Sequence, residues 1–195
     1  MPEYNLNKLT DCKWINLYSA DYADKNGSVS NWTLVSRKEQ PITDAAQPDA
    51  VVIVPVLDTP QGRRLVVTKE FRVPIWDYEY GFAAGLIEKG QTVEQAVEKE
   101  LKEETGLDLA GIVHISSPVY SSAGMTDESC CMVIVEAKGQ ISDEFLEGSE
   151  QIEAILMDVD DIQDLLESGR KISAKAWGLL YYCVAAGSVD LLTRE

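Results

Sequence analysis

Histidine and basic side chains are scarce in this chain of 195 residues. His114 is the only histidine, and it sits in the alternating, strand-like run GIVHISSPVY. A Ser-His-Asp triad or a multi-histidine zinc site is therefore disfavoured. Lysine and arginine total 17 against 33 acidic residues, a formal net charge of −16. This balance argues against a nucleic-acid polymer or an anionic membrane as partner, because both attract basic surfaces.

Cysteines and long apolar runs are also few. The four cysteines have no disulfide-framework spacing, and the adjacent Cys130 and Cys131 would point to opposite faces of a strand. We therefore expect reduced, mostly buried thiols. No run approaches the roughly 18 apolar residues that a membrane span needs, and the N-terminus lacks an apolar signal core. A cytoplasmic location is the resulting expectation.

The pattern along the chain predicts a small N-terminal β element, residues 1–45, and a main domain, residues 46–195. Strand-like segments at 13–20 and 29–37 precede a polar connector with two prolines. The main domain has apolar strand patterns at 50–57, 64–72, 78–85, 112–119, 129–137 and 152–158, and helical patterns at 93–105, 160–168 and 174–186. Strands flanking helices without regular alternation predict an α/β sandwich with a mixed sheet.

The most informative stretch is GLIEKGQTVEQAVEKELKEETGL, residues 85–107. Thr92 and Gln95 predict a capping box at the start of a helix, and Gly106 is placed to end it. Glu100, Glu103 and Glu104 then project from one side of the helix, beside or opposite its apolar stripe. Crowded carboxylates favour a hard divalent cation such as Mg²⁺, which prefers oxygen ligands. The alternative is an ordinary solvated helix face.

In context, the same residues resemble the Nudix box, a signature of phosphate-bond hydrolases. Seven positions fall in register with its pattern: Gly85, Glu100, Leu101, Glu103, Glu104, Gly106 and Leu107. Two positions depart, because Gln91 stands where the family has Glu and Lys99 where it has Arg. A Gln–Lys combination can still hydrogen-bond, but it loses the bidentate fork of arginine. The resemblance implies a weakened but usable metal site.

More of the chain resembles the ADP-ribose and ADP-sugar pyrophosphatase branch of this family. Its motifs correspond here to KEFRVP at 69–74, AAGLI at 83–87 and SSAGMTDE at 121–128. The resemblance implies Mg²⁺, with Mn²⁺ as the alternative, held by Glu100, Glu103, Glu104 and the Ala84 carbonyl. It implies a substrate site that includes Arg37, Arg72, Gly124 and Met125, and adenine stacking by Trp14 and Trp32 in a swapped homodimer.

From the residues alone, Trp14 and Trp32 lie on a β element too small to bury them. They are either buried against another surface or available for a flat ligand, and a dimer interface could combine the two. Arg37 and Arg72 are likewise either surface charges or phosphate-binding forks.

The branch also implies a late acidic loop that supplies the general base. Glu150 aligns with its later acidic position, whereas Gly148, with Glu147 adjacent, falls at the earlier one. The base is therefore Glu147, Glu150 or the box residue Glu103. Gly81 is a further departure, because the branch usually has Glu there.

The expected activity is hydrolysis of a small nucleoside diphosphate, such as ADP-ribose, to AMP and a sugar phosphate. The alternative from a different class is a nucleotide-binding sensor that has lost turnover, marked by the changes at Gln91, Lys99, Gly81 and Gly148.

Overall fold

A computed structural model describes residues 4–42, 47–148 and 150–193. The chain divides into two compact units. Unit 1 comprises Met1–Asp49 and Pro118–Cys130, and unit 2 comprises Ala50–Ser117 and Cys131–Glu195. The sequence placed a boundary at residue 45/46 and assigned 118–130 to the main domain, whereas the structure groups that segment with the N-terminal strands. Each unit is described by itself.

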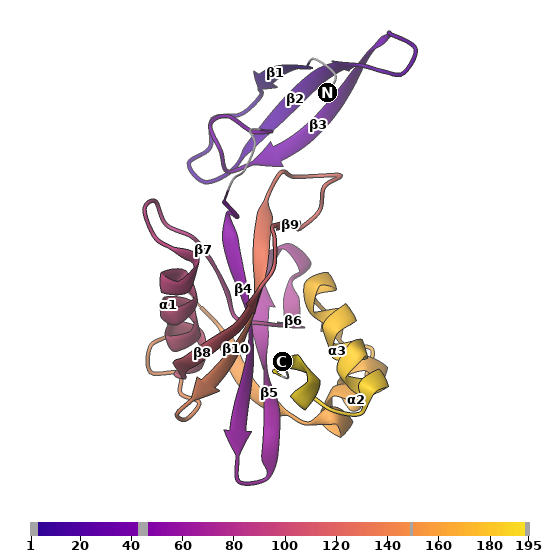
Figure 1. The fold of residues 1–195 in the computed structure, drawn as a ribbon. Coiled ribbons are helices and arrows are strands. Elements are labelled where there is room, and N and C mark those ends of the chain that lie inside the picture. The colour runs from indigo at the N-terminus through magenta and orange to yellow at the C-terminus, as the bar shows by residue number, and fades with distance from the viewer. Residues whose placement is uncertain (1–3, 43–46, 149, 194–195) are drawn as a thin grey trace. The chain divides into compact units, whose positions relative to one another are not determined.

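Unit 1 is built on an antiparallel sheet in the order β1 (Tyr4–Lys8), β2 (Asn16–Ala23) and β3 (Val29–Ser36), drawn in indigo in Figure 1. Its small core comprises Tyr18, Ala20 and Leu34, with Leu6 packed against them. The sequence missed β1, because its segment YNLNK is mostly polar and exposed.

The segment 118–130 contains β9 (Val119–Tyr120), which pairs with the first residues of β10 (Ser129–Lys138). It also meets β3, because the Val35 N–H donates to the Met125 carbonyl at 2.8 Å. The Lys38 ammonium lies 3.0 Å from the Asp49 carboxylate and 3.6 Å from that of Asp127. These contacts join sequence-distant pieces into one unit.

Unit 2 is a mixed sheet flanked by helices. The sheet follows the order β12-β6-β5-β4-β10-β8, with β7 paired to β4 and β11 to β5. Only the β12–β6 pair is parallel among the described pairings of this unit. The strands not yet bounded are β4 (Ala50–Thr59), β5 (Gly62–Arg72), β6 (Asp77–Gly81), β7 (Ala84–Leu86), β8 (Asp108–Ile115), β11 (Ile152–Met157) and β12 (Lys171–Ile172).

The helices of unit 2 are α1 (Val93–Thr105), α2 (Val159–Glu167) and α3 (Ala174–Ala186), with short 3-10 turns η1 (Val73–Ile75) and η2 (Asp190–Leu192). Figure 1 shows α1 on one side of the strands and the α2–α3 pair on the other. The apolar stripe of α1 packs on residues of β4 and β10 to form the main core. This architecture confirms the predicted α/β class with a mixed sheet.

The thiols follow the sequence prediction with one exception. Cys130, Cys131 and Cys183 are buried and Cys12 is exposed, and none of these described cysteines forms a disulfide. His114 is an exposed residue of β8. Among the described residues, no helix has the length and apolar character needed to cross a membrane.

Candidate active site

Helix α1 presents the box glutamates, and local signals set its limits. The Thr92 hydroxyl accepts from the Gln95 N–H, and the Gln95 side chain accepts from the Thr92 N–H, so the predicted capping box is present. Gly106 ends the helix with φ of 74°, a left-handed conformation that favours glycine. Helix limits and caps therefore agree with the sequence, and the rotation of the helix decides where each glutamate points.

Glu104 points into the protein, and only 7% of it is exposed. The Ala84 N–H donates to Glu104 Oε2 at 3.2 Å. Burial, and then the negative charge of Glu70, raises the pKa of Glu104 to about 9. The sequence placed this residue beside or opposite the core face, which is wrong because β7 and β11 also pack against α1.

Glu100 lies against β7, and its side chain is only 12% exposed. A Cβ atom at position 85 would lie only 2.1 Å from the Glu100 carboxyl carbon, so the box glycine Gly85 leaves the space that this carboxyl needs. Burial raises the pKa of Glu100, opposed by the charge of Lys99 and increased by the charges of Glu103 and Glu150.

The altered box positions meet through a residue that the sequence reading missed, Glu88. The Gln91 side-chain oxygen accepts from the Glu88 N–H at 3.0 Å, and the Glu88 carboxylate lies 3.2 Å from the Lys99 ammonium. Lys99 also lies 3.3 Å from the Glu100 carboxylate and 3.6 Å from that of Glu103. Glu88 thus provides a carboxylate for Lys99 beside the uncharged Gln91.

A second strand brings another carboxylate to this side of the sheet. Glu70 of β5 stands opposite Ile152 of β11, and the Phe71 N–H donates to the Gln151 carbonyl at 3.0 Å. The late acidic loop therefore joins β11 beside Glu70. Burial raises the pKa of Glu70, while the Arg72 guanidinium lowers it and the charge of Glu150 raises it.

The two acidic candidates in the late loop differ in environment. The Glu147 N–H donates to Glu150 Oε2 at 3.1 Å, and the Glu150 N–H donates to the Glu147 carbonyl at 2.9 Å. Glu147 is exposed, whereas Glu150 is half-buried. The negative charge of Glu150 contributes to the raised pKa of Glu70, Glu100 and Glu104 alike. Glu150, rather than Glu147, therefore belongs to the carboxylate cluster electrostatically.

This cluster suits a hard divalent cation. Among the described residues, no group of three acidic, histidine or cysteine side chains is already gathered at metal-binding distances. The donors nevertheless share the required chemistry, because they are carboxylates whose mutual repulsion and burial disfavour ionisation. A divalent cation stabilises the ionised carboxylates and accepts oxygen ligands. The residues present therefore fit Mg²⁺ or Mn²⁺.

Arg72 lies at the end of β5 next to this cluster. Its guanidinium is 2.7 Å from the Glu70 carboxylate and 3.8 Å from that of Glu79. These residues line a cavity of about 40 Å³ that Ala84 also borders. Arg72 and Ala84 therefore line the same cavity. Glu70 could have been noticed from sequence, because it lies two residues before Arg72 in a predicted strand and so shares its face.

Unit 1 gathers the other predicted substrate residues. The Trp32 indole N–H donates to the Gly124 carbonyl at 3.2 Å, and Arg37 lies 3.1 Å from the Glu128 carboxylate. Trp32 is 49% exposed. Met125 is exposed and contacts β3 through its carbonyl. The structure therefore joins Trp32, Gly124 and Met125 around one part of β3.

Trp14 lies on the loop between β1 and β2 and is 71% exposed. The Lys13 ammonium lies 4.2 Å from the centre of its indole ring. The sequence left open whether the two tryptophans are buried. Neither is buried within unit 1. Among the described aromatic contacts, none joins Trp14 to Trp32.

Comparisons with known proteins relate the chain to named enzymes. The NUDIX domain family matches residues 46–177. ADP-ribose pyrophosphatase of Saccharomyces cerevisiae is 29% identical over 182 residues, which cover 88% of this chain and 77% of the yeast protein. ADP-ribose pyrophosphatase of Bacillus subtilis is 28% identical over 171 residues, which cover 87% of this chain and 85% of the Bacillus protein. ADP-sugar pyrophosphatase of Mus musculus is 30% identical over 132 residues, which cover 67% of this chain and 59% of the mouse protein.

A solved structure described as an ADP compounds hydrolase has the same fold. Its TM-score is 0.74 at 22% identity, and the match covers 96% of this chain and 97% of that chain. The family predicted from the box, and the resemblance to the ADP-ribose and ADP-sugar pyrophosphatases, are thereby confirmed. With its box on α1 and a family match across most of its length, the chain belongs to the Nudix hydrolase family.

Proposed function

We propose that this chain is a divalent-metal-dependent pyrophosphohydrolase that cleaves ADP-ribose, or a related ADP-sugar, to AMP and a sugar phosphate. The observation that carries the proposal is the environment of Glu104. This buried carboxyl has the Ala84 N–H as a hydrogen-bond donor and lies in the negative field of Glu70, Glu100 and Glu150. Such a site stabilises a cation and is poorly suited to a purely structural role.

Glu100 and Glu104 would hold the metal, with Glu103 and the Ala84 carbonyl as further ligands. A bound Mg²⁺ or Mn²⁺ would neutralise charge on the diphosphate oxygens and lower the pKa of a water. Arg72 would hold a phosphate oxygen with the guanidinium N–H groups that its carboxylate partners leave available. The carboxylates Glu70 and Glu79 already orient that guanidinium.

Glu150 is the base that this arrangement favours over Glu147 and Glu103. It is half-buried and acts electrostatically on the box glutamates, whereas Glu147 is exposed and Glu103 lies 3.6 Å from the Lys99 ammonium. A base must remain ionised and free of a competing cation to accept a proton. Glu150→Gln should therefore lower kcat more than Glu147→Gln does, with the Mg²⁺ requirement retained.

Nucleoside recognition is proposed for unit 1, through Trp14 and Trp32. Support comes from two exposed indoles in the same unit and from the names of the relatives, which act on ADP-containing compounds. Arg37 is proposed to contribute a further contact to phosphate or ribose, since only its Nε is engaged by Glu128 in the described contacts.

The test is a hydrolysis screen that compares ADP-ribose, other nucleotide sugars and dinucleotides, each with Mg²⁺ and with a chelator. We expect chelator-sensitive turnover of ADP-ribose, with AMP and ribose 5-phosphate as the products. Turnover of another diphosphate alone would keep the hydrolase and change the substrate. Binding of ADP-ribose without turnover of any compound would contradict the proposal and favour the sensor alternative.

A further inference from the structure

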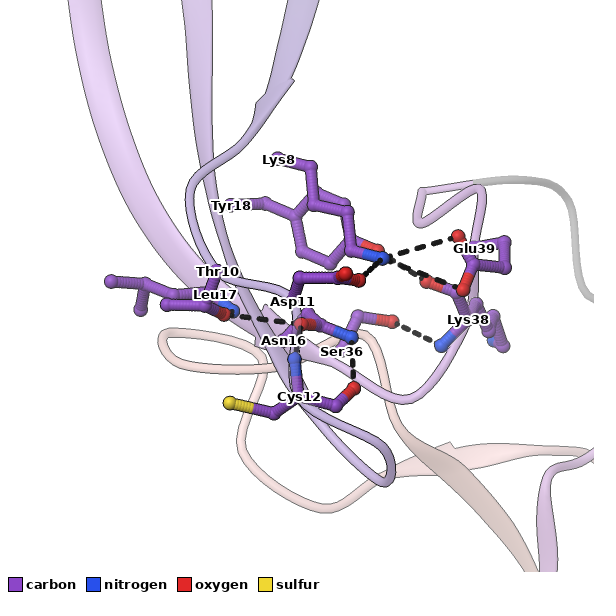
Figure 2. Close-up of polar contacts among 10 residues, drawn as sticks. All are labelled: Lys8, Thr10, Asp11, Cys12, Asn16, Leu17, Tyr18, Ser36, Lys38 and Glu39. Carbon is purple, nitrogen blue, oxygen red and sulfur yellow. Dashed lines mark hydrogen bonds and ion pairs between the residues drawn. The ribbon is translucent and has the colours of Figure 1, made fainter.

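The loop that carries Trp14 is tightly held, although the indole itself is exposed. Asn16 is only 7% exposed, and its side-chain amide binds both backbone polar groups of Cys12. The Asn16 oxygen accepts from the Cys12 N–H at 2.7 Å, and the Asn16 NH₂ group donates to the Cys12 carbonyl at 2.9 Å. One buried side chain therefore closes the loop at Cys12 (Figure 2), which precedes Trp14 by two residues in the sequence.

Thr10 completes this clamp. Its hydroxyl donates to the Asn16 oxygen at 3.2 Å and accepts from the Leu17 N–H at 2.9 Å. Thr10 of the loop is thus connected by its side chain to the first two residues of β2, in addition to the Leu9 N–H bond to the Leu17 carbonyl.

The loop is also tied to the segment that follows β3. The Lys8 ammonium lies 3.2 Å from the Asp11 carboxylate and 3.4 Å from that of Glu39 (Figure 2). The Tyr18 hydroxyl donates to the Lys38 carbonyl at 2.8 Å. The exposed ion pairs contribute little to stability, so the buried Asn16 bonds are the main restraint on the loop.

We propose that Asn16 is a positioning residue for nucleoside recognition, which holds the loop so that Trp14 is presented for stacking on a purine base. Lys13 lies over one face of the indole, so the base would stack on the other face. A loop ordered before binding loses less conformational entropy when the ligand arrives. The inference rests on the proposed function, because Trp14 must contact the base, and Asn16 itself does not touch substrate.

A double-mutant cycle tests this role. The wild type, Trp14→Ala, Asn16→Ala and the double variant are compared by ADP-ribose kinetics and by calorimetric binding of AMP. We expect Asn16→Ala to raise the KM for ADP-ribose and the Kd for AMP about tenfold, with kcat within about twofold. In the Trp14→Ala background, Asn16→Ala should have no further effect, because it acts through the indole.

Matched variants separate positioning from general damage. Asn31→Ala removes another asparagine of unit 1 that donates to Asp21 at 2.6 Å, away from the loop, and should leave KM and Kd unchanged. Thr10→Ser retains the bridging hydroxyl and should behave as the wild type, whereas Thr10→Val should weaken AMP binding. If Asn16→Ala does not fold, Thr10→Val takes its place in the cycle, with Thr10→Ser as its control.

The outcomes separate the positioning role of Asn16 from base recognition by Trp14. The positioning role would be overturned if Asn16→Ala raised KM and Kd equally in the wild-type and Trp14→Ala backgrounds. It would also be overturned if Asn16→Ala lowered kcat while KM and Kd stayed unchanged. Weaker binding in Trp14→Ala with normal binding in Asn16→Ala would overturn the inference alone. Normal AMP binding in Trp14→Ala would overturn base recognition by Trp14 as well. Because AMP binding needs no turnover, these readings hold even if ADP-ribose is not hydrolysed.

Discussion

Glu104 is the residue on which the proposed metal site depends. Its raised pKa means that the metal-free protein holds this carboxyl protonated at neutral pH, and that a divalent cation would displace the proton. The same burial that makes the group a strong ligand makes its ionised form costly in the absence of metal. In the proposed role of Glu104, a bound divalent cation would offset this energetic penalty.

This penalty predicts how the stability of the metal-free protein depends on pH. The pKa of Glu104 is raised from 4.5 to about 9, so between these values the folded chain retains a proton that the unfolded chain has released. Its contribution to stability is complete below pH 4.5 and declines as pH rises, by up to about 1.4 kcal/mol per pH unit. Denaturation with chelator should show a steeper decline between pH 6 and 8 for wild type than for Glu104→Gln. Parallel curves would contradict the burial argument.

Position 85 requires a glycine because the Glu100 carboxyl group lies where a side chain would be, not because of an unusual backbone conformation. A Cβ atom there would overlap the Glu100 carboxyl group, so Gly85→Ala must displace a proposed metal ligand. We expect at least a tenfold loss of turnover and a loss of stability of about 1–3 kcal/mol. Activity assays and denaturant unfolding measure the two effects. Gly111→Ala is the control, because nothing lies within 4 Å of a Cβ at that glycine; normal turnover in Gly85→Ala would refute the steric explanation.

At the scale of elements, local sequence signals predicted the helix limits well, whereas the packing between distant elements could not be predicted from them. The limits of α1 follow from Thr92, Gln95 and Gly106, which act within one turn of the helix ends. The burial of Glu104 depends on strands that are distant in sequence, which an apolar stripe cannot reveal. Ser173 is the N-cap residue of α3, but its side chain makes no capping hydrogen bond. The roles of Glu70 and Glu88 likewise required the fold.

The β7–α1 loop and α1 are connected through Glu88 and Lys99. Removing Glu88 would leave Lys99 paired with Glu100 and Glu103, where its charge competes with a metal ion. Glu88→Gln should therefore raise the Mg²⁺ concentration for half-maximal activity several-fold, while stability falls by no more than about 1 kcal/mol. A Mg²⁺ titration of activity measures this effect. Glu98→Gln, an exposed change on the same helix, is the control; equal titrations for all three proteins would contradict the coupling.

At the scale of the molecule, the grouping of 118–130 with the N-terminal strands could not be read from sequence. It depends on contacts such as Trp32 with Gly124 and Arg37 with Glu128, which are separated by 92 and 91 positions. No apolar periodicity encodes such pairings. The family resemblance did point to the same residues, because motifs preserve a shared site without describing how its parts meet.

Dimerisation is a prediction at this scale. Unit 1 exposes Trp14 and Trp32 on a sheet whose core is small, and apolar surface of this kind favours association. Light scattering should give twice the mass of the 21.6 kDa chain. Because the net charge is −16, the dimer should strengthen when salt is added. A monomeric mass at both low and physiological salt would exclude the homodimer.

The most direct test of the central claim is Mg²⁺-dependent hydrolysis of ADP-ribose by wild type and by Glu104→Gln. Glutamine can still accept a hydrogen bond from the Ala84 N–H, so the fold should persist, as circular dichroism can verify. We predict chelator-sensitive turnover in wild type and a loss of at least about a hundredfold in the variant, since an anionic metal ligand is removed. Equal Mg²⁺-dependent turnover in a folded Glu104→Gln protein would contradict the assignment of this carboxylate cluster as the catalytic metal site.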